Sequence, residues 1–179
     1  MEGVRSIVLM GVSGCGKSFI GEALARELNM EFVEGDEFHT SENEKKMRAG
    51  IPLDDDDRMG WLKKLAELAC DRTNPLIISC SALKRSYREI LCSKGADLVF
   101  VHLHAPREVI EPRIKERTGH FFDPGLLTSQ YETLEALEGG EVALPRRIAK
   151  SLLRLRAQPS ALSASQEPGW GRGWGLGSG

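Results

Sequence analysis

The sequence lacks the features of several large protein classes. No Cys-x-x-Cys pair and no cluster of cysteine and histidine is present, which argues against a zinc site and against a secreted disulfide framework. No apolar run approaches the roughly 20 residues of a membrane span, and the first five residues do not form a signal peptide. We therefore expect a soluble, cytoplasmic protein. The four cysteines lie far apart, at Cys15, Cys70, Cys80 and Cys92.

A strong charge of either sign is also lacking, because 24 Lys and Arg residues stand against 26 Asp and Glu residues in the 179-residue chain. The net charge of −2 gives no general attraction to nucleic acid or acidic membranes. The two parts of the chain differ in net charge, which is −5 for residues 1–135 and +3 for residues 136–179. Gly, Ser and Pro dominate residues 157–179, which predicts a disordered tail.

Apolar and amphipathic segments alternate along the first 135 residues. This alternation predicts an α/β fold, with a parallel sheet between two helical layers. Four strands are visible, at 6–10, 31–35, 75–79 and 97–103. Helices are expected at 17–28, at 43–50, after the acidic run 54–57, at 81–91 and after Pro106.

The segment GVSGCGKS matches the phosphate-loop pattern G-x-x-x-x-G-K-[ST] between a buried strand and an amphipathic helix. In such a loop, backbone N–H groups surround the phosphates of ATP. Lys17 would reach the β- and γ-phosphates as a catalytic group, and Ser18 would ligate Mg²⁺. The predicted ATP-binding residues are Gly11, Val12, Ser13, Gly14, Cys15, Gly16, Lys17 and Ser18.

The third predicted strand ends in Ser79-Cys80-Ser81 without the acidic residue that GTPases and motor ATPases usually place there. An Asn-Lys-x-Asp guanine-binding motif is missing as well, and the chain is too short for a motor or transporter ATPase. A small kinase that acts on a metabolite or nucleotide fits these features best.

Asp36 follows the second strand in GDEFH, where it could accept a substrate hydroxyl or its proton, or could instead cap a helix. His39, by position alone, is expected in an exposed loop.

Two pairs of cations have the i,i+4 spacing of one helix face. Lys84 and Arg88 would either bind an anionic substrate or lie on a solvated surface. Arg113 and Arg117 precede the glycine-containing segment TGHFF, residues 118–122. They would belong either to a lid at about 113–130 or to an ordinary basic helix end. Pro112 should kink this helix.

Together these segments resemble gluconokinases, of the adenylate-kinase-like small P-loop kinases. The matching text is GVSGCGKS, GDEFH, the block from Asn43 to Leu62, CSALKRSYR and GHFFDPGLLTSQYETLE. The resemblance implies phosphorylation of D-gluconate to 6-phospho-D-gluconate with ATP and Mg²⁺, in a cytoplasmic homodimer. It implies a catalytic role for Asp36 and Arg117. It also implies substrate binding by Asp36, His39, Lys84, Arg88 and His120.

The motifs of the resemblance end near Glu135, and a family-like fifth strand is not visible after it. Residues 1–135 are the predicted kinase domain, and residues 136–156 are expected to form an atypical basic helical segment. One alternative is therefore a splice or frame variant with impaired catalysis, which binds nucleotide weakly or not at all. A kinase for another sugar acid or polyol is the second alternative.

Overall fold

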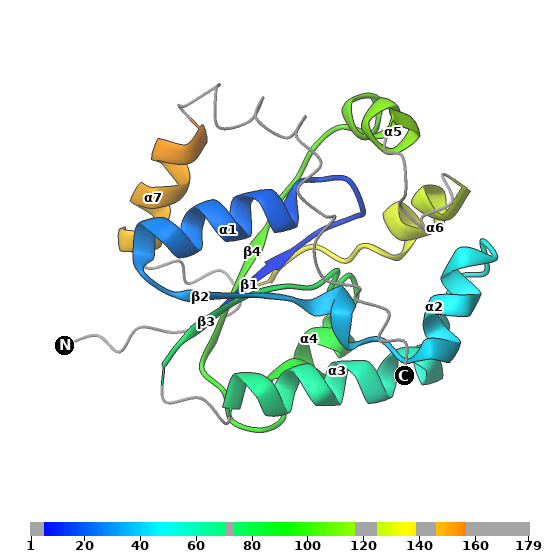
Figure 1. Cartoon of the computed structure of the whole chain (residues 1–179), viewed down its shortest axis with the longest axis horizontal. Coiled ribbons are helices and arrows are strands. Elements are labelled where there is room, and N and C mark those ends of the chain that lie inside the picture. Colours follow the sequence, from blue (N-terminus) through cyan, green and yellow to red (C-terminus); the bar gives the residue numbers. More distant parts are fainter. Residues whose placement is uncertain (1–5, 71–73, 117–124, 139–145, 157–179) are drawn as a thin grey trace, which may run out of the picture.

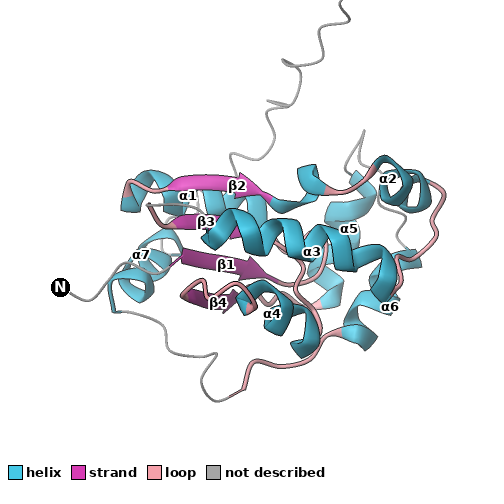
Figure 2. Ribbon diagram, turned by 90° about the horizontal axis from the view of Figure 1, so that it is seen from below, coloured by secondary structure: helices cyan, strands magenta, loops and turns pink. Residues whose placement is uncertain are grey.

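The computed structural model describes residues 6–70, 74–116, 125–138 and 146–156. Their centre is a parallel sheet with the strand order β2-β3-β1-β4 (Figure 2). Ile7 of β1 pairs with Ile77 of β3 on one side and with Val99 of β4 on the other. The strands are β1 (Ser6–Met10), β2 (Glu31–Glu34), β3 (Leu76–Ser79) and β4 (Leu98–His102). The predicted α/β fold with four parallel strands is confirmed.

Helices cover both faces of the sheet (Figure 1). α1 (Lys17–Leu28) and α7 (Arg146–Arg156) lie on one face, and α3 (Asp55–Cys70) and α4 (Arg85–Cys92) lie on the other. The remaining helices gather beyond the carboxyl ends of the strands, where ligands bind in open α/β sheets. These are α2 (Ser41–Arg48), α5 (Arg107–Glu116) and α6 (Gly125–Thr133).

Several element boundaries differ from those predicted. β2 ends at Glu34 because Gly35 begins a short 3₁₀ helix, Gly35–Phe38. α2 begins at Ser41, since the Thr40 hydroxyl accepts the N–H of Asn43 and caps the helix. The helix expected from residue 81 begins only at Arg85, because the preceding residues are not helical and Ala82 has a φ of 42°.

Helix α7 occupies the last part of the predicted basic segment 136–156 and packs against α1, whereas residues 136–138 are not helical. Ile148 and Ser151 are buried, and Ile148 joins Leu24 and Leu28 in the core on this face. At the surface, Arg154 pairs with Glu27 of α1 at 3.3 Å. This helix therefore belongs to the folded body, although its sequence lies beyond the motifs of the resemblance.

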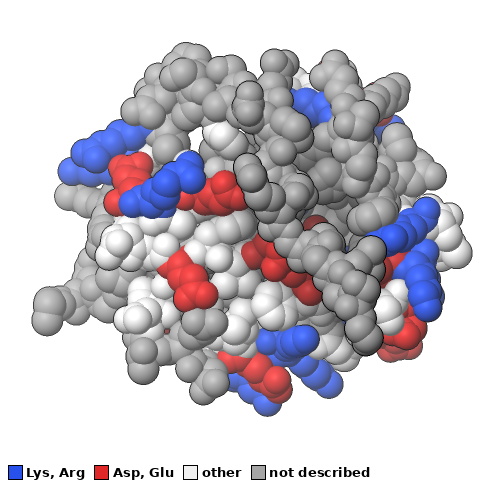
Figure 3. All heavy atoms as spheres, viewed as in Figure 1, with Lys and Arg blue, Asp and Glu red and all other residues white. Residues whose placement is uncertain are grey.

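Figure 3 views the surface from the same side as Figure 1. On the described part of that surface, basic and acidic side chains are interspersed, and neither sign forms a continuous patch. None of the helices in the described segments has both the length and the apolar composition needed to cross a membrane.

Candidate active site

The phosphate loop has a backbone that glycine makes possible. Gly14 and Gly16 have φ angles of +78° and +95°, in the left-handed region that favours glycine. At Gly11, a Cβ atom would lie 2.7 Å from the carbonyl oxygen of Leu103, so a side chain would force the loop away from the end of β4. Gly16 directly precedes α1, so the free N–H groups of the helix start belong to the same loop. Such a loop can hold an anionic group through its backbone.

Lys17 folds back across this loop. Its Nζ atom donates to the carbonyl oxygens of Gly11 at 3.0 Å and Val12 at 3.1 Å. Ser18 is half-buried in the first turn of α1. The ammonium group and the hydroxyl therefore both lie at the start of α1, as the phosphate-loop motif predicts.

The end of β2 is fixed by contacts of Gly35. A Cβ atom there would lie 2.1 Å from the carbonyl oxygen of Ser79, so only glycine allows the two strands to approach in this way. The Gly35 N–H donates to Ser79 Oγ at 3.1 Å, and Trp61 Nε1 donates to the Gly35 carbonyl at 2.7 Å. Ser79 Oγ in turn donates to Glu34. These bonds fix the backbone from which Asp36 extends.

The Asp36 side chain is 69% exposed, and its Oδ1 atom lies 4.0 Å from His39 Nε2. The capping residue of the following helix α2 is Thr40, so Asp36 does not have that role. The pKa of the Cys80 thiol is raised to about 12, mainly by burial; a backbone hydrogen bond at Ala82 opposes this rise, the charge of Asp36 adds to it and the charge of Lys17 opposes it. The charged groups of Asp36 and Lys17 therefore both lie close enough to the buried Cys80 thiol to act on its pKa.

The prediction that His39 is exposed is wrong. Its side chain is 3% exposed, and its ring stacks on Trp61 with the ring centroids 4.1 Å apart. Burial, followed by the positive charge of Arg58, lowers the pKa of His39 to about 4. The imidazole is therefore neutral at pH 7, and its Nδ1 atom is buried without a hydrogen-bond partner among the described residues.

An open cavity of about 510 Å³ is lined by residues at the start of α3, at the start of α4 and in α6. Two of its lining residues connect it to the phosphate loop, because Leu83 packs with Val12 and Gln130 accepts a hydrogen bond from Ser13. The lining residues are Pro52, Leu53, Asp54, Asp55, Asp56, Arg58, Leu83, Lys84, Tyr87, Ser129, Gln130 and Thr133.

Lys84 supplies a cation to this cavity. Its Nζ atom lies 2.6 Å from Asp55 Oδ1, and the Tyr87 hydroxyl donates to the same oxygen. The hydrogen bond to Asp55 raises the pKa of Lys84, and the bond from Lys84 lowers the pKa of Asp55. Arg58 adds a second cation, with its guanidinium 5.7 Å from the centroid of the Tyr87 ring. A lysine ammonium and an arginine guanidinium can each bind a carboxylate.

Arg88 does not share a cationic face with Lys84, which corrects the prediction from their spacing. Lys84 precedes α4, whereas Arg88 lies within it and is only 1% exposed. Among its partners, the Arg88 guanidinium donates to the backbone carbonyl oxygens of Ala82, Leu83, Glu135 and Ala136. Its geometry is that of a structural clamp, which joins the segment after α6 to the start of α4.

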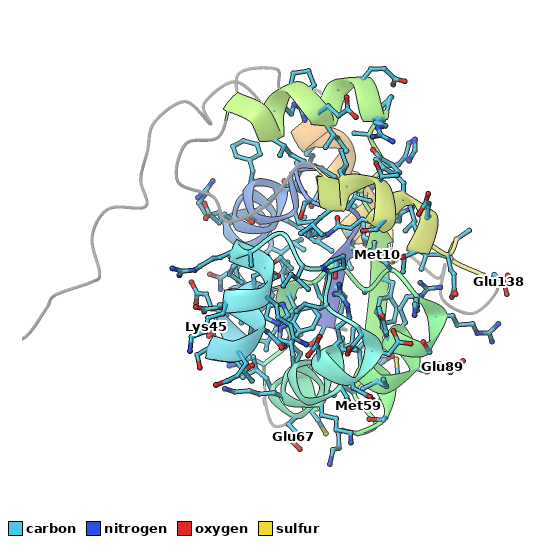
Figure 4. All side chains as sticks on the ribbon, turned by 90° about the vertical axis from the view of Figure 1, so that its right-hand side faces the viewer. Met10, Lys45, Met59, Glu67, Glu89 and Glu138 are labelled. Atoms are coloured by element: carbon cyan, nitrogen blue, oxygen red, sulfur yellow. The ribbon has the colours of Figure 1, made fainter. Side chains whose placement is uncertain are left out.

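Helix α6 lies against the phosphate loop and α5. Gln130 Oε1 accepts the Ser13 N–H at 2.7 Å, and the Tyr131 hydroxyl donates to the Ala105 carbonyl at 3.0 Å. Leu127 is fully buried beside Ile110 of α5. Figure 4 views this end of the sheet: Met10, the last residue of β1, lies near the centre, with α5 and α6 above it and α2 and α3 below.

Part of the predicted lid lies outside the described residues, including Arg117 and His120. Arg113 is exposed within α5, and Pro112 lies inside the same helix. Three residues of the site were missed by the sequence reasoning, namely Asp55, Arg58 and Gln130. The first two lie at the acidic helix start, where the charges were interpreted only through the helix dipole, and Gln130 lies in the block GLLTSQYETLE.

Comparisons with known proteins place this geometry in a family. The model of a family described as "AAA domain" matches residues 7–134. The thermoresistant gluconokinase of Escherichia coli (strain K12) is 47% identical over 131 residues, which cover 72% of this chain and 75% of that protein. The chain belongs to the gluconokinase family.

The family likeness extends further than the motifs. A probable gluconokinase of Mus musculus is 36% identical over 177 residues, covering 88% of this chain and 96% of that protein. Because residues 1–135 are about three quarters of the chain, this match continues past Glu135. The crystal structure of a gluconokinase from Sinorhizobium meliloti 1021 has a TM-score of 0.71 and 43% identity, over 91% of this chain and 98% of that one.

Proposed function

We propose that this chain transfers the γ-phosphoryl group of ATP to the 6-hydroxyl of D-gluconate, giving 6-phospho-D-gluconate and ADP. The observation that carries this proposal is a phosphate loop joined to a cavity with two cations, in a chain of the gluconokinase family. Gluconate has one carboxylate and a distant hydroxyl, so a cation of the cavity that binds the carboxylate would leave that hydroxyl free to reach the loop.

The loop residues fit a nucleotide with Mg²⁺. The positive φ angles of Gly14 and Gly16 and the close contact at Gly11 leave backbone N–H groups, rather than side chains, to surround the phosphates. Ser18 would hold Mg²⁺ through its hydroxyl, and the ion would neutralise charge on the β- and γ-phosphates. Lys17 would exchange its bonds to Gly11 and Val12 for phosphate oxygens.

In the transfer step, the gluconate 6-oxygen forms a bond to the γ-phosphorus while the bond from that phosphorus to the ADP oxygen breaks. We assign Asp36 as the group that accepts the hydroxyl proton, because it extends from the end of β2 as an exposed carboxylate. Lys17 and Arg117 would stabilise the charge on the transferred group, Arg117 by its match to the family motif.

For the substrate, we assign Lys84 and Arg58 to the gluconate carboxylate because both line the cavity. His39 and His120 remain proposed substrate ligands on the resemblance. Arg88 would act indirectly, through the backbone at Ala82 and Leu83 that precedes Lys84. A cytoplasmic location and a homodimer remain predictions from the same resemblance.

A coupled assay of the purified chain tests this function. We expect ADP release that depends on gluconate at saturating ATP and Mg²⁺, and we expect Lys17→Ala to abolish it. Activity that survives Lys17→Ala would come from a contaminant. A panel of sugar acids and polyols distinguishes gluconate from related substrates, and no gluconate-dependent release would instead favour an impaired variant.

A further inference from the structure

Gln130 lies between the phosphate loop and the substrate cavity. Its Oε1 atom accepts the backbone N–H of Ser13 at 2.7 Å, although the two residues are 117 positions apart. The same residue lines the cavity, together with Ser129 and Thr133 of its own helix and with Lys84. One side chain therefore takes part in both halves of the site, and the function proposed above gives it no role.

The Ser13 N–H belongs to the segment of the loop that would surround a phosphate, between Gly11 and Gly14. A carboxamide oxygen and a phosphate oxygen are both hydrogen-bond acceptors, and an N–H group supplies a single proton. The Gln130 oxygen and a nucleotide phosphate therefore compete for this donor.

Other contacts hold α6 without Gln130. The Tyr131 hydroxyl donates to Ala105, Arg107 donates to Thr128 Oγ1 at 2.9 Å, and Leu127 is fully buried. The Gln130 side chain can therefore leave Ser13 while its helix stays in place. Its amide would then offer two donors and an acceptor at the cavity wall, which are the groups that bind sugar hydroxyls.

We propose that Gln130 makes the binding of nucleotide and of gluconate cooperative. A phosphate oxygen takes the Ser13 N–H, and the released amide binds a hydroxyl of the sugar acid. The gluconate half of this proposal rests on the function proposed above. One hydrogen bond of ordinary strength predicts that a bound ATP analogue tightens gluconate binding about two- to tenfold.

The first test measures the gluconate dissociation constant by calorimetry, with and without a non-hydrolysable ATP analogue and Mg²⁺. We expect the ratio of the two constants to be about two to ten in the wild type and near one in Gln130→Leu. Thr128→Val is the matched control, because it removes the bond from Arg107 to α6 and should keep the wild-type ratio. Equal ratios in the wild type and Gln130→Leu would overturn the proposal.

The second test uses the nucleotide analogue alone and does not depend on gluconate. Gln130→Leu removes the competing oxygen, so we expect it to bind the analogue about two- to tenfold more tightly than the wild type. Gln130→Glu keeps an acceptor for Ser13 but adds a negative charge, and it should bind more weakly than the wild type. Unchanged nucleotide affinity in both variants would overturn the proposal. Failure of the wild type to bind gluconate, with these shifts present, would count against the substrate and not against the competition at Ser13.

Discussion

The imidazole of His39 stacks on the indole of Trp61, with ring centroids 4.1 Å apart and an interplanar angle of 22°. Trp61 in turn donates to the carbonyl of Gly35, so the stack ties the GDEFH segment to α3. Asp36 lies 4.0 Å from the same imidazole, and the charge of Arg58 also acts on it. The proposed proton acceptor thus lies beside a neutral, buried histidine.

We expect the chain to lose stability as the pH falls from about 6.5 to about 4, in part through His39. Burial lowers the pKa of His39 to about 4, so within this range the unfolded state binds the extra proton. Above pH 6.5 the neutral His39 costs the folded state no stability relative to the unfolded state. Near pH 4 protonation of the unfolded state lowers the free energy of unfolding by about 3 kcal/mol. The measurement is the free energy of unfolding in urea at pH 7 and pH 4.5.

His39→Phe is the control, because it keeps an aromatic ring against Trp61 and removes the titrating group. Since carboxylates also titrate in this range, the difference between the two proteins isolates the histidine. Equal pH dependence in the wild type and His39→Phe would contradict the prediction.

Lys84→Met should raise the KM for gluconate about 10- to 100-fold, because a charge-assisted hydrogen bond to the substrate carboxylate is lost. The KM for ATP should change little. Arg85→Met is the matched control, since Arg85 is the neighbouring cation but pairs with Glu89 and Glu138 outside the cavity. Steady-state kinetics with each substrate varied in turn distinguishes the two variants, and an equal change in both would argue against Lys84 as the anchor.

Arg88→Met should lower the free energy of unfolding by about 3 kcal/mol or more, without any ligand present. The substitution removes a buried guanidinium and leaves the carbonyl oxygens of Ala82, Leu83, Glu135 and Ala136 without that donor. Arg88→Lys should restore only part of the loss, because one ammonium group does not match a guanidinium fork. A wild-type melting temperature with weak gluconate binding would instead indicate direct contact with substrate.

Ile148→Ala should cost about 2–4 kcal/mol of stability, because Ile148 is 3% exposed in the core between α7 and α1. Lys150→Ala, on the exposed side of the same helix, should change stability by about 0.5 kcal/mol or less. Chemical denaturation of the two variants measures the difference. If Ile148→Ala were as stable as Lys150→Ala, α7 would not be part of the cooperative fold.

Gly14→Ala should lower both stability and nucleotide affinity. Its φ of +78° is unfavourable for alanine, and a Cβ atom would lie 2.9 Å from Ile114 Cγ1. Gly60→Ala is the opposite case, since Gly60 lies within α3 with no atom within 4 Å of its Cβ position. That variant should gain about 0.5–1 kcal/mol. Thermal melts with and without an ATP analogue compare the two.

Local patterns in the sequence determined the α/β fold, the phosphate loop and the extent of α1, because each depends on neighbouring residues. The continuous apolar run of β1 and the glycine spacing of the loop are of this kind. The basic helix α7 was also predicted from its own apolar stripe, but its position on α1 was not.

Tertiary structure alone decided which polar side chains face the cavity. Lys84 and Arg88 have the spacing of one helix face, yet α4 begins at Arg85, and the buried Arg88 guanidinium donates to the carbonyls of Glu135 and Ala136. His39 is buried because Trp61, 22 positions later, covers its ring. Gln130 reaches Ser13 across 117 positions. Contacts between such distant residues depend on how the helices pack, which no local pattern encodes.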